Sequence, residues 1–183
     1  MTTSIELPPL ASYQKAAIFC DERVSVIEAT TKCGKTAGAI FWLFEGAMNE
    51  GQPGREFWWV APIYDQAKIA YRRMKLMLQQ TDASGDMFST NDSELFIKLQ
   101  NGAVMRFKSG DKPDGLFGED TYRMVIDEAS RLKADAWYAA RSTTTAVSGK
   151  IRIIGNVKGK KNWAYRLARQ AEAEPRPSPS CPN

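Results

Sequence analysis

Residues 29–36, with the sequence ATTKCGKT, have the types and spacing of a loop that binds nucleotide phosphates. In the pattern GxxxxGK[ST], a glycine at position 34 lets backbone N–H groups surround the phosphate oxygens. Lys35 then reaches the β- and γ-phosphates, and the Thr36 hydroxyl reaches a Mg2+ ion. Alanine stands at the first position of the pattern, so we expect the loop either to open with ordinary backbone angles or to carry strain. The candidate nucleotide-binding residues of the loop are Ala29, Thr30, Thr31, Lys32, Cys33, Gly34, Lys35 and Thr36.

A second group that could do chemistry is the carboxylate pair Asp127 and Glu128, which ends the apolar run 124–126. Such a run is typical of a strand buried in a parallel sheet. At the carboxyl end of that strand, Asp127 can hold magnesium, as the aspartate of a Walker B motif does. Glu128 can orient and deprotonate the attacking water. A solvated turn is the alternative for the pair alone, but together with the phosphate loop the pair favours nucleotide hydrolysis.

Composition narrows the chemistry further. The chain has 183 residues, a net charge of +4, three cysteines without metal-ligand spacing, and no histidine. Disulfide scaffolds, histidine-bound metals and Ser-His or Cys-His catalysis are therefore disfavoured or excluded. The sequence shows neither a charged-then-apolar leader nor an apolar run approaching about 18 residues, so we expect a cytoplasmic protein that does not enter a membrane.

The elements that must position these groups follow from apolar periodicity. Apolar runs predict strands at 24–28, 57–61, 124–126 and 151–155, and helices are expected at 13–20, 35–48, 64–80, 133–140 and 162–173. Segments 95–99 and 104–108 flank Asn101-Gly102, which predicts a β-hairpin. Residues 82–94 are polar and rich in turn formers. The domain boundaries that follow are an amino-terminal arm at 1–12, a nucleotide-hydrolase domain at 13–172, and a disordered Pro/Ser-rich tail at 173–183.

Strands that alternate with helices predict an α/β fold with three layers, a mostly parallel P-loop sheet carrying the β-hairpin as an insertion. Ligands of such sheets bind at the carboxyl ends of the strands, where the phosphate loop, Asp127-Glu128 and Asn156 all emerge. One further strand is expected between the phosphate-loop strand and the Asp-Glu strand. With the adjacent glutamate, this arrangement indicates a RecA-like (ASCE) motor and not a nucleotide kinase or GTPase.

Two further features leave alternatives open. Tyr13 and Gln14 precede the first strand and could stack on adenine and bond its edge, or could simply begin a surface helix. Basic residues crowd the last third of the chain, which suits a polyanion such as DNA, although a solvated face explains them equally well. These residues are Lys150, Arg152, Lys158, Lys160, Lys161, Arg166 and Arg169.

The order of these motifs resembles the ATPase domain of the large terminase subunit of tailed bacteriophages. The segments that carry the resemblance are YQ at 13–14, ATTKCGKT at 29–36, FWWVAPIYDQAK at 57–68, IKLQNGAVMRFKSGDKPDGLFGED at 97–120, MVIDEASRL at 124–132 and IIGNVKGKKNWAYRL at 153–167. Each segment is weak alone, and their order and spacing make the match specific.

The resemblance implies a ring-forming motor that uses ATP and Mg2+ to move double-stranded DNA into a procapsid, together with a portal and a small terminase subunit. It implies that Lys35 and Thr36 bind phosphate and Mg2+, that Asp127 holds Mg2+ and that Glu128 is the catalytic carboxylate. Asn156 would be the coupling residue that senses the γ-phosphate. Gln14 would contact adenine.

The sequence departs from the family in two ways. Lys32 stands near the place of a phosphate-loop arginine and lacks the bidentate fork of that residue. The family's carboxyl-terminal nuclease domain has no counterpart after residue 170, so we expect no nuclease activity. An arginine from a neighbouring subunit is also implied, with Arg106, Arg131 and Arg141 as candidates. The alternatives are a prophage remnant that binds nucleotide without turnover and another RecA-like or helicase-type ATPase.

Overall fold

A seven-stranded sheet forms the centre of the molecule in the computed structural model, which describes residues 10–30, 33–82, 85–156, 159 and 162–173. The strands lie in the order β1-β7-β6-β2-β5-β4-β3. Their bounds are β1 Val24–Glu28, β2 Glu56–Ala61, β3 Phe88–Asn91, β4 Phe96–Leu99, β5 Val104–Ser109, β6 Thr121–Ile126 and β7 Lys150–Gly155. The first five strands in this order are parallel, and β4 and β3 are antiparallel. The predicted α/β fold is confirmed, with β7 as the expected strand between β1 and β6.

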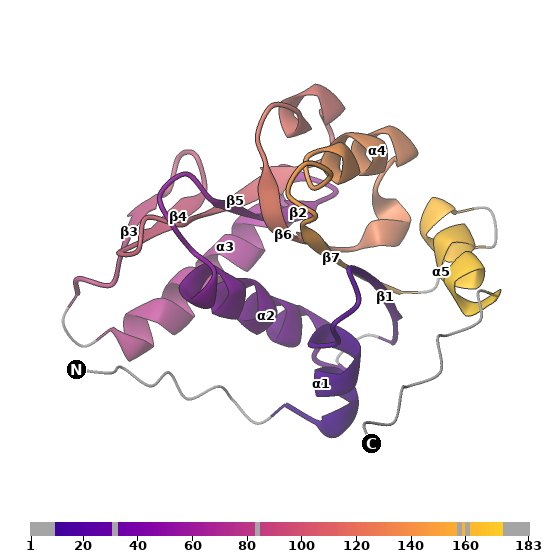
Figure 1. Ribbon diagram of the computed structural model, residues 1–183, viewed down its shortest axis with the longest axis horizontal. Coiled ribbons are helices and arrows are strands. Elements are labelled where there is room, and N and C mark those ends of the chain that lie inside the picture. The colour runs from indigo at the N-terminus through magenta and orange to yellow at the C-terminus, as the bar shows by residue number, and fades with distance from the viewer. Residues whose placement is uncertain (1–9, 31–32, 83–84, 157–158, 160–161, 174–183) are drawn as a thin grey trace, which may run out of the picture.

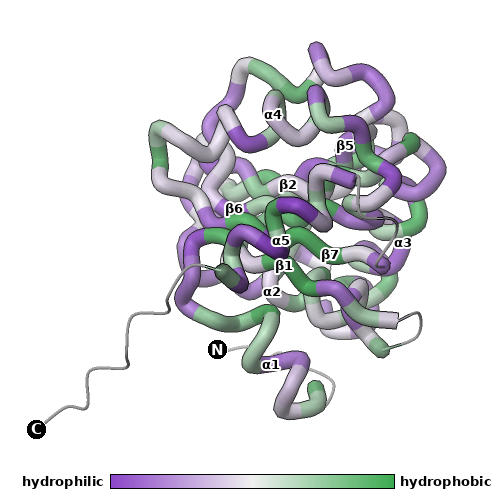
Figure 2. The backbone as a smooth tube through the Cα atoms, turned by 90° about the vertical axis from the view of Figure 1, so that its right-hand side faces the viewer, coloured by the Kyte–Doolittle hydropathy of each residue, from purple (hydrophilic) through white to green (hydrophobic). Residues whose placement is uncertain are grey.

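Helices cover both faces of the sheet and complete the three layers (Figure 1). One face carries α1 (Ser12–Ile18), α2 (Lys35–Asn49) and α3 (Tyr64–Thr81). The other carries α4 (Ala134–Ser142), α5 (Trp163–Ala173) and two short 3-10 turns, η1 (Pro113–Leu116) and η2 (Ala129–Arg131). In Figure 2 the apolar strands β1 and β7 run between more hydrophilic outer segments.

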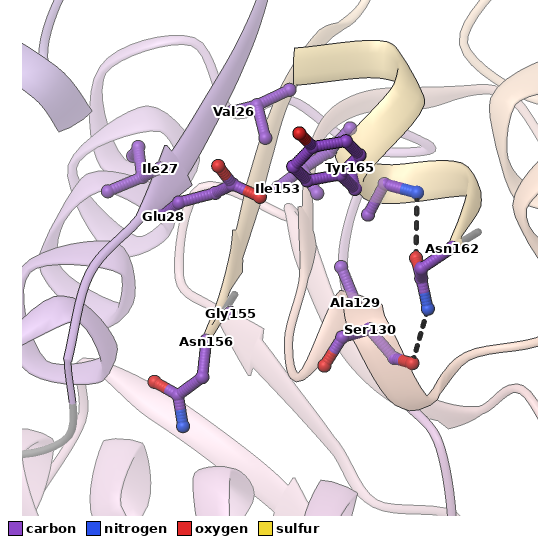
Figure 3. A pocket seen from close by; sticks show the side chains of 11 residues that line it. Val26, Ile27, Glu28, Ala129, Ser130, Ile153, Gly155, Asn156, Asn162 and Tyr165 are labelled. Carbon is purple, nitrogen blue, oxygen red and sulfur yellow. Dashed lines mark hydrogen bonds between the residues drawn. The ribbon is translucent and has the colours of Figure 1, made fainter. Parts of the chain in front are cut away.

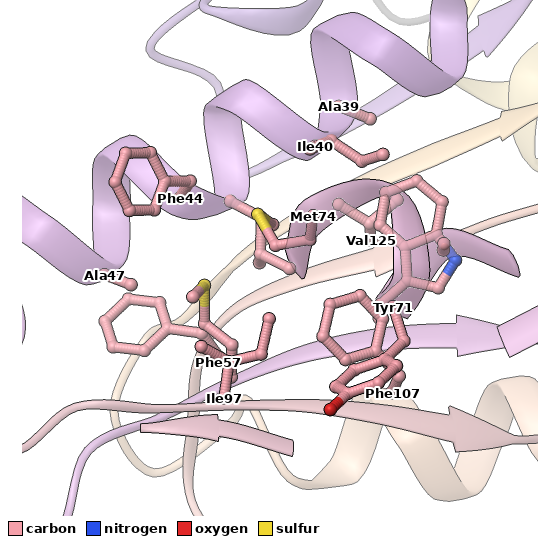
Figure 4. Close-up of a cluster of buried hydrophobic side chains, with 14 of the residues drawn as sticks. Ala39, Ile40, Phe44, Ala47, Phe57, Tyr71, Met74, Ile97, Phe107 and Val125 are labelled. Atoms are coloured by element: carbon pink, nitrogen blue, oxygen red, sulfur yellow. The ribbon is translucent and has the colours of Figure 1, made fainter. Parts of the chain in front are cut away.

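The larger core lies between the sheet and α2 and α3 (Figure 4). α3 turns one apolar stripe to the sheet, with the helical spacing i, i+3, i+4, i+7 and i+11. Its buried residues are Ala67, Ala70, Tyr71, Met74 and Leu78. β2 is buried at all six of its residues, as expected for a central strand with helices on both faces. Trp58 and Trp59 are fully buried, so both indole rings belong to the core.

The predicted hairpin is present but is part of the main sheet. β4 pairs antiparallel with β5, and β5 pairs parallel with β2 from Glu56–Val104 to Ala61–Ser109. A third strand, β3, pairs with β4 and falls in the segment that the sequence analysis treated only as polar and turn-rich. β3 has only four residues and none of them is buried. Its sequence, FSTN, contains no apolar run that would have indicated a strand. The predicted arm (1–12) and tail (173–183) lie almost wholly outside the described residues.

None of the helices in the described ranges is both long and apolar enough to cross a lipid bilayer.

Candidate functional site

The predicted phosphate-binding loop leaves β1 and ends at Gly34, which is the N-cap of α2. Gly34 has φ 81°, a left-handed conformation that costs little only for glycine. A Cβ atom at this position would also lie 2.2 Å from the Gln14 Nε2 atom. Ala29 is absent from the residues with positive φ, so the loop opens with ordinary backbone angles. Thr31 and Lys32, two of the predicted loop residues, lie outside the described residues.

The Lys35 ammonium lies where the loop and the end of β7 meet. It donates to the backbone oxygens of Ala29 and Thr30, the latter at 2.7 Å, and to Asn156 Oδ1 at 3.2 Å. It also lies 3.6 Å from the Cys33 sulfur. Two residues 121 positions apart in the sequence, both predicted for the site, are therefore in direct contact. The register brings them together, because Glu28 pairs with Gly155 at the ends of β1 and β7.

Asp127 and Glu128 follow β6 directly, at the same edge of the sheet. Burial, and then the neighbouring Glu128 carboxylate, raise the pKa of Asp127 to about 6, while the charges of Arg73 and Lys35 act in the opposite direction. Asp127 Oδ1 accepts a hydrogen bond from the Glu128 backbone N–H at 2.9 Å. Glu128 itself has φ 47°, a left-handed conformation that is rare for a non-glycine residue. Such strain is typical of functional sites and fixes the direction of the side chain.

Gln14 reaches the phosphate loop from α1. Its Nε2 donates to the Cys33 backbone oxygen at 2.7 Å, and its Oε1 accepts from the Ala11 N–H at 2.7 Å. The hydroxyl of Tyr13, a residue that is 60% exposed, lies 3.3 Å from the same Cys33 oxygen. The structure thus places Gln14 against the loop backbone, and its contact with adenine stays a prediction.

A buried arginine holds α1 in this place. Arg152, on β7, has no exposed surface and donates to the backbone oxygens of Ile18, Cys20 and Glu22, the first at 2.6 Å and the last at 2.9 Å. Its guanidinium also lies over the Trp42 ring. The sequence analysis counted Arg152 in a basic surface cluster, and this interpretation is wrong. A guanidinium can instead satisfy several carbonyl oxygens at once, which a strand pattern does not reveal.

Beside the loop, a small hollow of about 10 Å3 lies between the ends of β1 and β7, η2 and α5 (Figure 3). Asn162 closes it by donating from Nδ2 to the Ser130 backbone oxygen at 2.6 Å and accepting from the Ala164 N–H at 2.8 Å. Arg169 pairs with Glu28 at 2.7 Å, which ties α5 to the end of β1. α5 is therefore attached both to the phosphate-loop strand and to the turn that follows Glu128.

Several site features were not predicted. Arg73 is exposed on α3 and acts electrostatically on Asp127, and nothing in its sequence position marks it. The Ser130 hydroxyl is buried without a hydrogen-bond partner among the described residues. Among the candidate arginines for a neighbouring site, Arg106 is paired with Glu56 of its own chain at 2.6 Å, whereas Arg131 and Arg141 are exposed. Thr36 is partly buried as the second residue of α2.

The oxygen atoms of Thr36 and Asp127 are of the kind that binds Mg2+. The described residues contain no cluster of three or more carboxylate, cysteine or histidine side chains that would hold a metal alone. Mg2+ is typically bound through one or two protein oxygens, with water and substrate phosphate completing its octahedron. The Thr36 hydroxyl and the Asp127 carboxylate therefore fit an ion that arrives with a nucleotide.

Two known proteins are similar to this chain in sequence. No protein-family model matches the chain. It is 29% identical over 149 residues to the terminase large subunit of Thermus phage G20c, and 28% identical over 149 residues to that of Thermus virus P23-45. Each match covers 70% of this chain and 29% of the relative, so the chain spans less than a third of the length of these proteins.

Solved structures give the same result for the fold. The large terminase ATPase domain of Thermus phage P74-26 has a TM-score of 0.71 and 24% identity, covering 84% of this chain and 67% of that chain. The large terminase of bacteriophage HK97 has a TM-score of 0.75 and 15% identity, and the match covers 91% of this chain and 38% of that chain. The large terminase of bacteriophage D6E, solved in complex with ADP, has a TM-score of 0.70 and 15% identity, and the match covers 90% of this chain and 43% of that chain. These matches confirm the resemblance to the ATPase domain of terminase large subunits.

Proposed function

We propose that this chain is the ATPase domain of a viral DNA-packaging motor, which couples hydrolysis of ATP to the movement of double-stranded DNA into a procapsid. One observation carries the proposal: Lys35 and Asn156 meet at the edge of the sheet where Asp127 and Glu128 also emerge. The relatives support the rest, because they are phage terminase large subunits and related proteins are solved with ADP and ATP-γ-S.

In the proposed reaction, the Lys35 ammonium leaves the backbone oxygens of Ala29 and Thr30 and binds the β- and γ-phosphate oxygens of ATP. Thr36 and Asp127 would hold Mg2+, which neutralises charge on the phosphates. Glu128 orients the attacking water in line with the γ-phosphate and accepts its proton. Asn156 contacts Lys35 from the end of β7, so it can sense the γ-phosphate and pass the change to that strand.

The proposed partners are double-stranded DNA, a portal, a small terminase subunit and further copies of this chain in a ring. We place this assembly in the cytoplasm of a bacterial host, because the relatives are phage proteins. The match to the phage DNA packaging motor protein gp11 supports assembly into a motor only through its fold, with a TM-score of 0.51 and 11% identity.

The test is ATP binding and steady-state hydrolysis by the purified chain with Mg2+, with and without double-stranded DNA. We expect turnover that is lost in Glu128→Gln, while that variant still binds ATP, and we expect Lys35→Ala to lose binding. Asp135→Asn, on an exposed carboxylate of α4, is the matched control and should keep both activities. Stimulation by DNA would support the motor, whereas binding without turnover would favour a remnant. Tight ATP binding by Lys35→Ala would contradict the phosphate-loop assignment.

A further inference from the structure

An open groove lies between α4 and α5, on the side of the sheet away from α2 and α3. The volume of the groove is about 570 Å3. Each helix lines it with positions i, i+3, i+4 and i+7, which is the spacing of one continuous helical face. The lining residues are Ala134, Trp137, Tyr138 and Arg141 of α4, Trp163, Arg166, Leu167 and Gln170 of α5, and Asn162.

The groove is aromatic at its base and positive at its rim. Trp137 and Trp163 stack with their ring centroids 5.0 Å apart, and Tyr138 is 63% exposed. Arg141 and Arg166 are exposed, and neither has an ion pair within the described part of the chain. No lining residue is acidic. Exposed aromatic surface beside arginines is typical of sites that bind proteins. The expected ligand carries an apolar anchor and negative charge.

The loop before β6 has those properties. Residues 110–120 contain four carboxylates and one lysine, and so have a net charge of −3. Phe117 is 56% exposed in the middle of this loop, so its ring is accessible to a partner. Asp114 and Asp120, on either side of it, are also exposed. The groove and this acidic loop are complementary in charge, and each has an exposed aromatic ring.

The acidic loop cannot reach the groove of its own chain. η1, in the first half of the loop, packs against α4, and Leu116 is fully buried in the same cluster as Ala136 and Trp137. Phe117 follows Leu116 directly, so it cannot cross α4 without pulling Leu116 out of that core. In Figure 1, α4 separates this turn from α5.

We propose that the α4–α5 groove binds the acidic loop of a second copy of this chain, with Phe117 as the anchor. Donor and acceptor are different surfaces, so the contact is heterologous and adds subunits head to tail, as a ring requires. The inference deepens the proposed function by naming the interface between motor subunits. It also links this interface to the nucleotide site, because Trp163 donates to the Leu132 backbone oxygen at 2.7 Å, directly after η2.

The experiment is sedimentation of the full chain over a range of concentrations, with two double variants. Phe117→Ala with Asp114→Lys removes the donor, and Arg141→Glu with Arg166→Glu removes the acceptor. All four residues are exposed, so both variants should stay folded, which melting curves check. We expect the unmodified chain to associate and each variant to associate at least about tenfold more weakly. Ile69→Ala, at a 49% exposed residue on the opposite face, is the control and should associate normally.

Mixing the two variants tests the head-to-tail geometry. One keeps a groove and the other keeps a loop, so an equimolar mixture should form a dimer that grows no further. A photoreactive benzoylphenylalanine at position 117 should cross-link to α4 or α5 of another chain. A chain that stays monomeric throughout, a mixture that stays monomeric, or cross-links to other surfaces would each overturn the interface. ATP binding is measured in the same samples, because binding by a single chain needs no residue of its neighbour. Loss of association with ATP binding retained is then distinguishable from failure of the proposed nucleotide site.

Discussion

The central strand β2 and the edge strand β1 differ in how deeply they are buried. β2, the middle strand of the seven, is buried at all six residues and lies between β6 and β5. β1, at one edge of the sheet, has one exposed and four partly buried residues, and only β7 pairs with it among the described strands. The phosphate loop leaves the shallow strand. Asp127 and Glu128 instead follow β6, which is buried at five of its six residues, so the candidate site joins an edge strand to the deeply buried centre of the sheet.

Charged groups differ between the amino end of the central strand β2 and the carboxyl end of its neighbour β6. Near β2, Glu56 is buried but accepts hydrogen bonds from Arg106 Nε and from Trp58 Nε1, each at 2.6 Å. Burial opposes the ionisation of Glu56, but these and a further hydrogen bond outweigh it and lower the pKa of Glu56. Directly after the carboxyl end of β6, the pKa of Asp127 is raised instead. A raised pKa at a functional site indicates a group held ready for a cation or a proton.

The largest expected effect separates the central strand β2 from the edge strand β1 by stability. Trp59→Ala in β2 should lower the free energy of unfolding by about 3–5 kcal/mol, because a fully buried indole leaves a cavity. Val26→Ala in β1 should cost less than about 2 kcal/mol, because Val26 is only partly buried. Denaturant titration of both variants measures the difference. Trp59→Phe is the control: it keeps a ring and removes an Nε1 atom that has no hydrogen-bond partner, so it should cost less than about 1.5 kcal/mol. Equal losses in β1 and β2 would refute the comparison.

A second prediction uses the pH dependence of stability. The pKa of Asp127 is about 6 in the folded chain against an ordinary 3.8, so the folded state binds more protons between these values. Stability should therefore fall as the pH rises from about 4 to about 6 and should then level off, by roughly 2–3 kcal/mol. Asp127→Asn cannot ionise and should not show this loss, so it should melt higher than the unmodified chain at pH 7.

The same two proteins supply their own control at about pH 3, where the Asp127 carboxyl is mostly neutral in both the folded and the unfolded chain, so their stabilities should nearly agree. The asparagine can still accept the Glu128 N–H through Oδ1, so no backbone contact is lost. If Asp127→Asn is less stable than the unmodified chain at pH 7, the carboxylate is not destabilised by its surroundings. At pH 7 the variant should also bind Mg2+-ATP more weakly.

Much of this fold was predictable, because its central strands are continuous apolar runs. The residue composition of β2, β6 and β7 allows little except burial in a parallel sheet. β3 was not predictable, since its polar residues pair only through the backbone with β4. The sequence also gave no sign that β5 would extend the main sheet, because strand order is decided by contacts between distant segments.

The site was predictable where it depends on strand ends and was not where it depends on side-chain packing. Lys35 and Asn156 were expected at one edge, and the register of β1 and β7 brings them together. The burial of Arg152 was not expected, because three carbonyl oxygens that satisfy it come from a loop more than a hundred residues away. Sequence patterns report the period of an element and not the partners of a single charged group.

A third prediction concerns the contact between α1 and the phosphate loop. Gln14→Ala removes the hydrogen bond to the Cys33 oxygen and should weaken ATP binding about three- to tenfold, equivalent to about 1 kcal/mol. Its effect on the free energy of unfolding should be smaller, because Gln14 is only partly buried. Tyr13→Phe, which removes a longer contact of 3.3 Å to the same oxygen, is the matched control and should bind almost normally. A Gln14→Ala variant with unchanged affinity would show that α1 does not shape the nucleotide site.

The smallest expected effect comes from comparing two residues that have the same left-handed backbone conformation. Glu128 and Leu95 have φ 47° and 51°, one beside β6 and the other next to β4 in the hairpin. A left-handed non-glycine residue costs on the order of 1 kcal/mol, and glycine removes that cost. Glu128→Gly should therefore raise the free energy of unfolding by up to about 1 kcal/mol while ATP turnover is lost.

Leu95→Gly relieves the same backbone but should destabilise the protein by about 2–4 kcal/mol, because Leu95 is 1% exposed and its side chain fills the core. Ser148→Gly, at φ 52° on an exposed residue, is the control and should gain a few tenths of a kcal/mol to about 1 kcal/mol without affecting turnover. Thermal melts and ATP hydrolysis measure all three variants. Opposite signs at Glu128 and Leu95 would mean that the left-handed conformation is retained for chemistry at one position and for packing at the other. A loss of stability at both would mean that Glu128 is also held by contacts that glycine cannot replace.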